Sequence, residues 1–407
     1  MSQDKKDKNL NVPPLRFPGF TDEWKETTIG DVAKIEKGNG ISKTQLSDEG
    51  EECILYGELY TKYKSEIIDE VYSKTGIDST KLTRSHVNDV IIPCSGESAE
   101  DIATARCVKK DGILLGGDLN IIRFDRQDGS FMSYQLNGKR KYDIARVAQG
   151  VSVVHLYPDH LKSVKIYLPQ LEEQQTIVTL LSLIDERIAT QTKIIDNLQS
   201  LIKGLNDSFH DNVLGEAISF DEIGNPYSGL SGKSGDDFGQ GSPYITYLNV
   251  YQNNVVDENR IDLVSIDANE KQNTVSYGDI LFTLSSETPE ETGIGCVYLG
   301  TSGKYFLNSF CFGITITQPD KVYPPYLAYL VSSSKFRKFV FPLAQGSTRF
   351  NLQKNDFMKK KFTLLPVERQ KEISTVLDTL NNRLSVEYKL TELYRKQKDY
   401  LLRNLFI

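Results

Sequence analysis

The clearest hydrophobic pattern in the chain is a heptad repeat that occurs twice, in residues 168–210 and again in residues 365–407. In each copy apolar residues recur in alternating steps of four and three, which indicates a coiled-coil seam rather than an ordinary amphipathic helix. Aligned on Gln174 and Gln370, the copies run in step at an offset of 196 residues. We therefore predict two similar long helices that pair with each other. Their main seam residues are Ile177, Leu181, Ile184, Ile188, Ile195, Leu198, Ile373, Leu377, Leu380 and Leu384.

Each predicted helix has a similar start and a polar residue at the same seam position. Leu168-Pro169 and Leu365-Pro366 place a proline where the first helical turn tolerates it, and acidic residues follow, where the helix dipole favours them. Gln191 and Glu387 interrupt the two seams. A polar seam residue can fix the register of a coiled coil at some cost in stability.

Outside these helices the pattern changes to short β-type runs separated by Gly, Ser and Asp turns. In the first segment we expect strands in residues 54–60, 90–93, 113–115, 120–124 and 164–168, and helical spacing in residues 131–146. Residues 216–364 repeat this order: 245–251 match 54–60, 279–290 match 89–100, and Ala344-Gln345-Gly346 matches Ala148-Gln149-Gly150. Both segments are thus predicted to be mixed α+β domains.

The predicted fold class is α+β, with two tandem similar domains separated and followed by long helices. These helices are expected to form an antiparallel coiled coil, which gives the chain pseudo-twofold symmetry. The expected divisions are a disordered lead-in at 1–14, a domain at 15–167, a helix at 168–213, a domain at 214–364 and a helix at 365–407.

Such a molecule would hold two related surfaces at a fixed separation. A helix of 33 residues from Ile177 to Phe209 spans about 50 Å at ~1.5 Å per residue, and dimeric DNA readers place half-sites roughly 34–36 Å apart.

The distribution of charge changes the interpretation of an acidic chain with net charge −7 and pI near 5.4. Residues 131–165 carry a local balance of +4 and residues 327–362 one of +7. Two basic stretches on an acidic body suggest anionic partners at two defined places, although solvated charged faces are the alternative. No apolar run approaches the ~20 residues of a membrane span. The five cysteines lack C-x-x-C spacing and the four histidines are scattered, so we expect a cytoplasmic protein without a structural metal.

Several short motifs are specific enough to suggest a protein family. They are the two Leu-Pro helix starts, Gly229-Leu230-Ser231-Gly232-Lys233-Ser234, Pro243-Tyr244-Ile245 and Gln345-Gly346-Ser347-Thr348-Arg349-Phe350-Asn351-Leu352. With the order of domains, they resemble specificity subunits of Type I restriction–modification systems, over nearly the whole chain from Leu15 onward. The first domain departs from the pattern, because Val151-Ser152-Val153 follows Gln149-Gly150 in place of Ser-Thr-Arg.

The resemblance implies a function and a set of partners. Each domain would be a target-recognition domain that reads one half of a split, asymmetric site in double-stranded DNA. The paired helices would set the spacer and dock two modification (methyltransferase) subunits, which methylate adenine, and restriction/translocase subunits would complete the nuclease. No cofactor is expected in this chain, whereas S-adenosylmethionine, Mg and ATP are implied for the partner subunits.

Candidate DNA-binding residues come from the basic segments and from the Gln-Gly turns that follow them. They are Lys139, Arg140, Lys141, Gln149, Gly150, Lys335, Arg337, Lys338, Gln345, Gly346, Ser347, Thr348 and Arg349. Basic residues supply phosphate contacts, and Arg349 could reach a phosphate or a guanine edge. Solvent-facing lysines and a structural turn are the alternatives. Residues 95–100 and 285–291 pair hydroxyls with carboxylates. A carboxylate beside DNA can accept from cytosine N4, but caps and turns are favoured for both loops.

Signals for catalysis are incomplete. Residues 229–234 end in Gly-Lys-Ser but have two residues between their glycines, where a phosphate loop needs four. Asn225-Pro226-Tyr227 lacks the second proline of an adenine-methyltransferase box. We therefore predict a non-catalytic subunit with no catalytic and no metal-binding residues. The alternatives are a self-contained DNA methyltransferase or nuclease with its own specificity domains, and a coiled-coil scaffold for proteins only, which the basic stretches disfavour.

Overall fold

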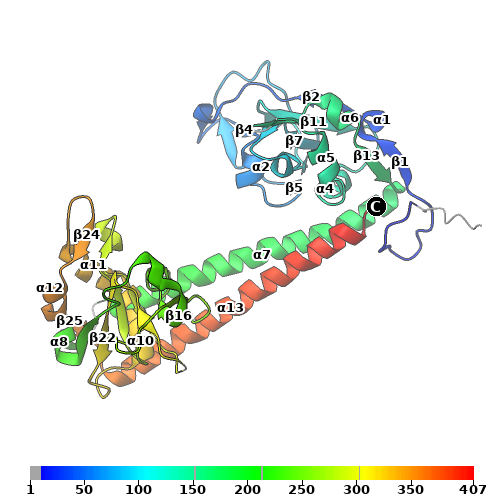
Figure 1. Ribbon diagram of the computed structural model, residues 1–407. Helices are drawn as coiled ribbons and strands as arrows, with labels where there is room; N and C mark the ends of the chain where they lie inside the picture. Colours follow the sequence, from blue (N-terminus) through cyan, green and yellow to red (C-terminus); the bar gives the residue numbers. More distant parts are fainter. Residues whose placement is uncertain (1–10, 151–152, 212–213, 302) are drawn as a thin grey trace, which may run out of the picture. The chain divides into compact units, whose positions relative to one another are not determined.

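The computed structural model describes residues 11–150, 153–211, 214–301 and 303–407, and these residues form two compact units (Figure 1). The first unit runs to Lys193 and also contains Lys389–Ile407, and the second is Ile194–Tyr388. Of the expected lead-in, residues 1–10 lie outside the described residues. The carbonyl of Asn11 accepts a hydrogen bond from Trp24 N at 2.8 Å.

The first unit is built on a five-stranded sheet in the order β2-β11-β7-β9-β5. These strands are β2 (Ala33–Lys37), β11 (Leu119–Phe124), β7 (Asp89–Pro93), β9 (Arg106–Val108) and β5 (Ile67–Ile68). Its other strands are β1 (Lys25–Thr28), β3 (Leu46–Ser47), β4 (Glu51–Ile54), β6 (Ser73–Thr75), β8 (Ser95–Gly96), β10 (Leu114–Leu115), β12 (Val154–His155) and β13 (Lys165–Leu168). Its short helices are α1 (Ile29–Val32), η1 (Lys43–Gln45), α2 (Glu58–Thr61), α3 (Ala99–Ile102), α4 (Gly129–Asn137), α5 (Lys141–Val147) and α6 (Pro158–Lys162).

The second unit repeats this order around a four-stranded antiparallel sheet, β15-β22-β18-β20. These strands are β15 (Gly224–Ser228), β22 (Cys311–Ile316), β18 (Ile280–Thr283) and β20 (Gly295–Val297). Its other strands are β14 (Glu216–Ile218), β16 (Phe238–Ile245), β17 (Asp262–Val264), β19 (Ser285–Ser286), β21 (Phe306–Leu307), β23 (Ala344–Gln345), β24 (Phe350–Leu352) and β25 (Phe362–Leu364). Its short helices are α8 (Phe220–Ile223), η2 (Gly235–Asp237), α9 (Tyr247–Gln252), η3 (Pro289–Glu291), α10 (Pro324–Ser332), α11 (Ser334–Val340), η4 (Phe341–Leu343) and α12 (Lys354–Lys359).

Two long helices complete the chain, and their order confirms the predicted sequence of domain, helix, domain, helix. They are α7 (Leu171–His210) and α13 (Val367–Asn404). In the first unit the beginning of α7 packs with the end of α13, and in the second unit the end of α7 packs with the beginning of α13. The pairing is therefore antiparallel. All ten seam residues are buried or half-buried, and so are Gln191 and Glu387.

The helices also take part in the two domain cores. Ile177, Leu181 and Ile184 of α7 join Leu401 of α13, and Phe406 just after α13, in the core that surrounds Trp24 and Phe131. Ile373 and Leu377 of α13 join the corresponding core of the second unit. Burying a large apolar side chain contributes roughly 1.5–3 kcal/mol, so each half-helix is held by its own domain as well as by the other helix.

A buried glutamine fixes the start of each long helix. Gln174 donates to the Pro169 carbonyl at 3.0 Å and accepts from the backbone N–H of Asp128 at 3.0 Å, the residue that caps α4. In the second unit Gln370 donates to the Leu365 carbonyl at 2.6 Å and accepts from Tyr323 N at 2.8 Å, next to α10. The offset of 196 residues that aligns the helices in sequence thus corresponds to the same contact in both units.

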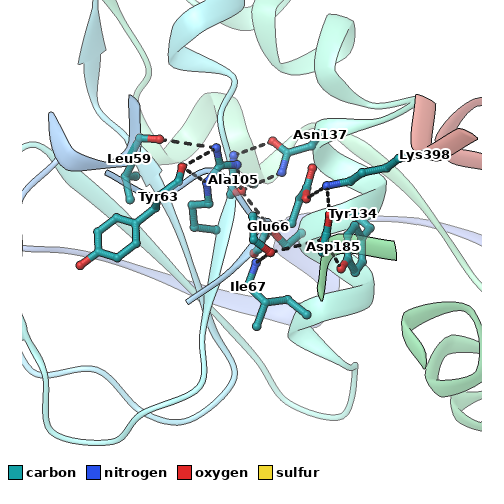
Figure 2. A network of polar contacts seen from close by, with 12 residues as sticks. Leu59, Tyr63, Glu66, Ile67, Ala105, Tyr134, Asn137, Asp185 and Lys398 are labelled. Atoms are coloured by element: carbon teal, nitrogen blue, oxygen red, sulfur yellow. Dashed lines mark hydrogen bonds and ion pairs between the residues drawn. The ribbon is translucent and has the colours of Figure 1, made fainter. Parts of the chain in front are cut away.

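The first unit adds a buried ion cluster to this docking (Figure 2). Lys398 of α13 pairs with Glu66 and, at 2.5 Å, with Asp185 of α7, while Tyr134 of α4 donates to Asp185 at 2.7 Å. Burial by itself lowers the pKa of Lys398, but the two carboxylates outweigh it and raise the pKa above its ordinary value. The residue 196 positions earlier is Ile202, so the two helix ends dock by different chemistry.

One predicted strand is wrong in part. Residues 54–60 were expected to form a single strand, but β4 ends at Ile54 and Glu58–Thr61 forms the helical turn α2. The matching run ends β16 at Ile245 and continues as α9. The run at 54–60 contains Gly57 and the charged Glu58, whose carboxylate accepts from Leu55 N at 3.0 Å, and this local contact favours a helical turn over a continued strand. Across the described residues no helix is long and apolar enough to cross a membrane.

Candidate nucleic-acid interface

The second unit brings two candidate loops into one small sheet, which includes the β24 hairpin beside α11 in Figure 1. Strand β24 pairs on one side with β19, where Ser285 lies opposite Asn351. It pairs on the other side with β23, where Gln345 lies opposite the same Asn351. The hydroxyl and carboxylate loop at 285–291 and the turn at 346–349 are therefore neighbours. We call this β19-β24-β23 sheet, with its two loops, the reading sheet of the second unit.

The first unit contains a corresponding reading sheet, formed by β8, β12 and the residue Gln149. Ser95 lies opposite His155 in the β8–β12 pair. Gln149 exchanges two backbone hydrogen bonds with His155, at 2.9 and 2.7 Å. These segments lie apart in the sequence of each unit, and the strand pairing joins them.

A glycine makes the same tight turn in both reading sheets. Gly150 has φ +130° and Gly346 has φ +151°, in the region that favours glycine. A Cβ atom on Gly150 would lie 2.1 Å from the Val153 carbonyl oxygen, and one on Gly346 would lie 2.0 Å from the Arg349 carbonyl oxygen. Both turns therefore require glycine, which supports the structural reading of the Gln-Gly motif and leaves the flanking side chains exposed.

Tyrosines that the sequence did not single out attach these sheets to the domain body. Tyr247 donates to the Ser285 carbonyl at 2.8 Å, and Tyr60 donates to the Ser95 carbonyl at 3.5 Å. Tyr251 donates to Glu291 at 2.6 Å. This hydrogen bond is the main reason that the pKa of Glu291 lies below its ordinary value. The signal in the sequence was only that both tyrosine-containing runs recur at matching places.

Some loop carboxylates have the capping and turn roles that were favoured for them. Ser98 accepts from Asp101 N at 3.1 Å and donates to the Asp101 carboxylate at 2.6 Å, at the start of α3. Ser286 donates to Glu291 at 3.1 Å. Glu97 and Glu287 remain exposed at the loop tips.

The basic candidates divide into exposed residues and residues with structural contacts. Lys335 and Lys338 are exposed on α11. Arg337, between them, donates to the carbonyls of Gly293, Glu290 and Thr292 at 2.6, 2.8 and 2.7 Å. Burial lowers the pKa of Arg337, and its donors hold the end of the 285–291 loop. Arg337 therefore stabilises the loop at the edge of the reading sheet.

The basic candidates of the first unit are all half-buried, and one of them has structural contacts. Arg140 donates to the Ile407 carbonyl at 2.9 Å, pairs with Asp143 at 3.1 Å and lies over the Tyr167 ring. It thereby fixes the end of the chain. Lys139 and Lys141 are half-buried beside it.

On the turn of the second unit, Gln345, Ser347, Thr348 and Arg349 are all exposed. Within the described ranges no group of three or more His, Cys, Asp or Glu is arranged to hold a metal ion.

Comparison with known proteins agrees with the repeated architecture. The family model described as Type I restriction modification DNA specificity domain matches residues 21–200 and 231–393. The Type I restriction enzyme MjaVIII specificity subunit of Methanocaldococcus jannaschii is 24% identical over 428 residues, covering 96% of this chain and 93% of that protein.

Solved structures share the fold at low sequence identity. The crystal structure of a Type I restriction–modification S subunit from M. genitalium gives a TM-score of 0.57 at 16% identity, over 97% of this chain and 99% of that one. A chain from a structural study of complex assembly and conformational transition in a Type I R-M system gives 0.60 at 15% identity, with the same coverage of 97% and 99%.

Proposed function

Since this chain belongs to the specificity subunits of Type I restriction–modification systems, we propose that it directs its complex to a bipartite, asymmetric DNA site. The target-recognition domains at 15–167 and 214–364 each read one half of the site. The helical segments at 168–213 and 365–407 set the spacer between the halves. The chain itself is non-catalytic, and adenine methylation and cleavage are carried out by its partners.

One observation carries this proposal: the two units present the same reading sheet with different side chains. Backbone pairing and the glycine turn are common to both. Val153 in one turn corresponds to Arg349 in the other, three residues after Gly150 and Gly346. A shared backbone suits a shared way of approaching DNA, while base edges are distinguished by side chains. Two such surfaces in one chain fit two unlike half-sites.

Exposed apolar residues on the long helices support their second role, the docking of protein partners. Leu183 and Leu201 of α7 and Val386 and Leu393 of α13 are between 48% and 61% exposed. Single exposed apolar residues are ordinary on a protein surface, so these residues are compatible with a protein interface and do not by themselves identify one. We assign these faces to the two modification subunits, to which the restriction/translocase subunits then bind.

The proposal is tested by single-molecule methylome sequencing. A host that expresses this chain with its modification subunit is compared with a host that expresses the modification subunit alone. We expect a split, adenine-methylated motif that disappears when this chain is removed. The motif also identifies both half-sites and the spacer.

Two outcomes would contradict the proposal. Methylation that persists unchanged without the chain would show that it does not direct the enzyme, and would favour a scaffold for proteins. Methylation of DNA by the purified chain with S-adenosylmethionine alone would favour a self-contained methyltransferase.

A further inference from the structure

An arginine on the reading sheet of the second unit lies on an exposed aromatic ring. The guanidinium carbon of Arg349 is 5.7 Å from the centroid of Phe310, and the Phe310 side chain is 53% exposed. A cation over an aromatic face within ~6 Å is attracted by about 0.5–1 kcal/mol at an exposed site. The ring therefore restricts the guanidinium without burying it.

The backbone of Phe310 is fixed beside the reading sheet. Its N–H donates to the Asn308 side chain at 2.9 Å. Its carbonyl accepts from the N–H of Leu284 at 2.8 Å, and Leu284 immediately precedes β19. Arg349 is placed by the turn at Gly346, which packs against the Arg349 carbonyl. Both partners thus have a defined backbone position on the same exposed surface.

The donors of Arg349 are free to bind a ligand. Within the part of the chain that the structure describes, its guanidinium forms no hydrogen bond and no ion pair, whereas Arg337 uses its donors on three carbonyls. An arginine beside a ring keeps a planar fork of N–H groups available. Such a fork matches two acceptors in one plane, and the O6 and N7 atoms of guanine are such a pair in the major groove.

The first unit has the same backbone arrangement without this pair. The Asp118 carbonyl accepts from Cys94 N at 2.7 Å, as the Phe310 carbonyl accepts from Leu284 N. Asp118 therefore occupies the place of Phe310, and Val153 occupies the place of Arg349. A general phosphate contact or a docking contact would be expected in both units. A pair present in one unit is better suited to reading a base of one half-site.

We propose that Arg349 reads a guanine in the half-site of the second domain, with Phe310 as the positioning residue that orients its guanidinium. This inference rests on the proposed function and names the base and the residues involved.

The test uses the full chain assembled with its modification subunit, and compares methylation rates on DNA libraries with each half-site randomised in turn. Arg349→Lys keeps the charge and loses the fork. Phe310→Leu keeps an apolar side chain and loses the ring, and Phe310→Tyr keeps the ring. We expect Arg349→Lys and Phe310→Leu to reduce the preference for guanine at one position of one half-site on the order of tenfold. Phe310→Tyr should retain that preference. The other half-site is an internal control for folding and assembly.

Three outcomes would overturn the inference. If Arg349→Lys lowers rates equally on all sequences, Arg349 is a phosphate contact. If Phe310→Leu leaves the preference unchanged, the ring does not position the arginine. If Phe310→Leu and Phe310→Tyr each reduce base preference at the two half-sites alike, Phe310 supports the fold. Failure of the unaltered complex to methylate any split motif would instead contradict the proposed function itself.

Discussion

Arg337 and Arg349 belong to the same basic stretch of sequence, but the structure uses them differently. Arg337 donates to three backbone carbonyls and is largely enclosed, while Arg349 is exposed at the turn. In the first unit Arg140 resembles Arg337, because its two terminal guanidinium nitrogens are also engaged within the protein. Charge alone does not identify a DNA contact at the residue scale, since free donors are also required.

This distinction predicts how the basic residues of α11 affect binding. Replacing Lys335 and Lys338 together with Ala should weaken binding to all DNA sequences. It should also reduce the slope of log K against log salt concentration by about two, because each phosphate contact contributes roughly 0.9 to that slope. Fluorescence anisotropy of the assembled complex at several salt concentrations measures this slope.

Arg337→Ala is the matched control for the lysine pair. It removes one positive charge from the same helix, but should lower the free energy of unfolding, because it leaves the Glu290, Thr292 and Gly293 carbonyls without their donors. An unaltered salt slope in the double lysine variant would remove α11 from the interface.

At the scale of elements, the two units dock their long helices at equivalent places with different residues. His210 stacks on Tyr326 with ring centroids 5.4 Å apart, and its Nδ1 donates to the Asn206 carbonyl at 2.7 Å. The residue 196 positions later is Phe406, which lies 5.3 Å from Phe131. The Nε2 atom of His210 is buried without a hydrogen-bond partner among the described residues. We therefore expect the docking contact of the second unit to be sensitive to protonation of His210.

Burial lowers the pKa of His210 below its ordinary value. The unfolded chain then binds a proton more readily than the folded one, so folding stability from this site is complete above about pH 6.5 and falls as pH decreases below it. We expect His210→Phe to remove this part of the loss of folding stability at low pH, which amounts to at most ~1.4 kcal/mol per pH unit. Urea unfolding at pH 7.5 and pH 5.0 measures the difference from the unaltered chain.

The reciprocal change, Phe406→His, is the control. It should introduce a similar loss of stability at low pH, localised to the first unit by hydrogen exchange of α4. Equal acid loss in the unaltered chain and in His210→Phe would show that this histidine does not contribute to it.

At the scale of the whole molecule, α7 and α13 each pass without interruption from one unit into the other. Each domain is held to the helices by its own contacts, including the hydrogen bonds that Gln174 and Gln370 accept from Asp128 N and Tyr323 N. In the proposed function the domains read the half-sites and the helices set the spacer, and these separate contacts should allow the two roles to be altered independently.

Deleting one heptad from both helices should shorten the spacer and leave both half-sites unchanged. Contacts within the first unit, Arg187 over Tyr394 and Asp185 with Lys398, give the register for the matched deletions 188–194 and 388–394. Seven residues remove about 10 Å at ~1.5 Å per residue, or roughly three base pairs at ~3.4 Å each. Methylome sequencing measures the spacer. A spacer that keeps its length would contradict the role of the helices as a ruler.

The sequence by itself determined the order of elements, because periodicity and repetition are local or one-dimensional properties. The heptads predicted α7 and α13, and the 196-residue offset predicted the repeat of domain and helix. The Gln-Gly turns were located as well, because a glycine at such a turn has a signature of its own. The expected strand at 54–60 is wrong beyond Ile54, because so short a run has no clear periodicity and a local hydrogen bond from Leu55 N to Glu58 favours a helical turn.

Only the tertiary structure decided which of the candidate residues are free to bind. Arg337 and Arg349 are the same residue type in the same basic stretch. Their surroundings differ because folding brings backbone carbonyls from residues 290–293 to Arg337 and the ring of Phe310 to Arg349. Likewise, the loops at 285 and 346 became one surface through pairing with β24. Such contacts join residues far apart in the chain, and the free energy that selects them comes from packing and hydrogen bonding of the whole domain rather than from any local pattern.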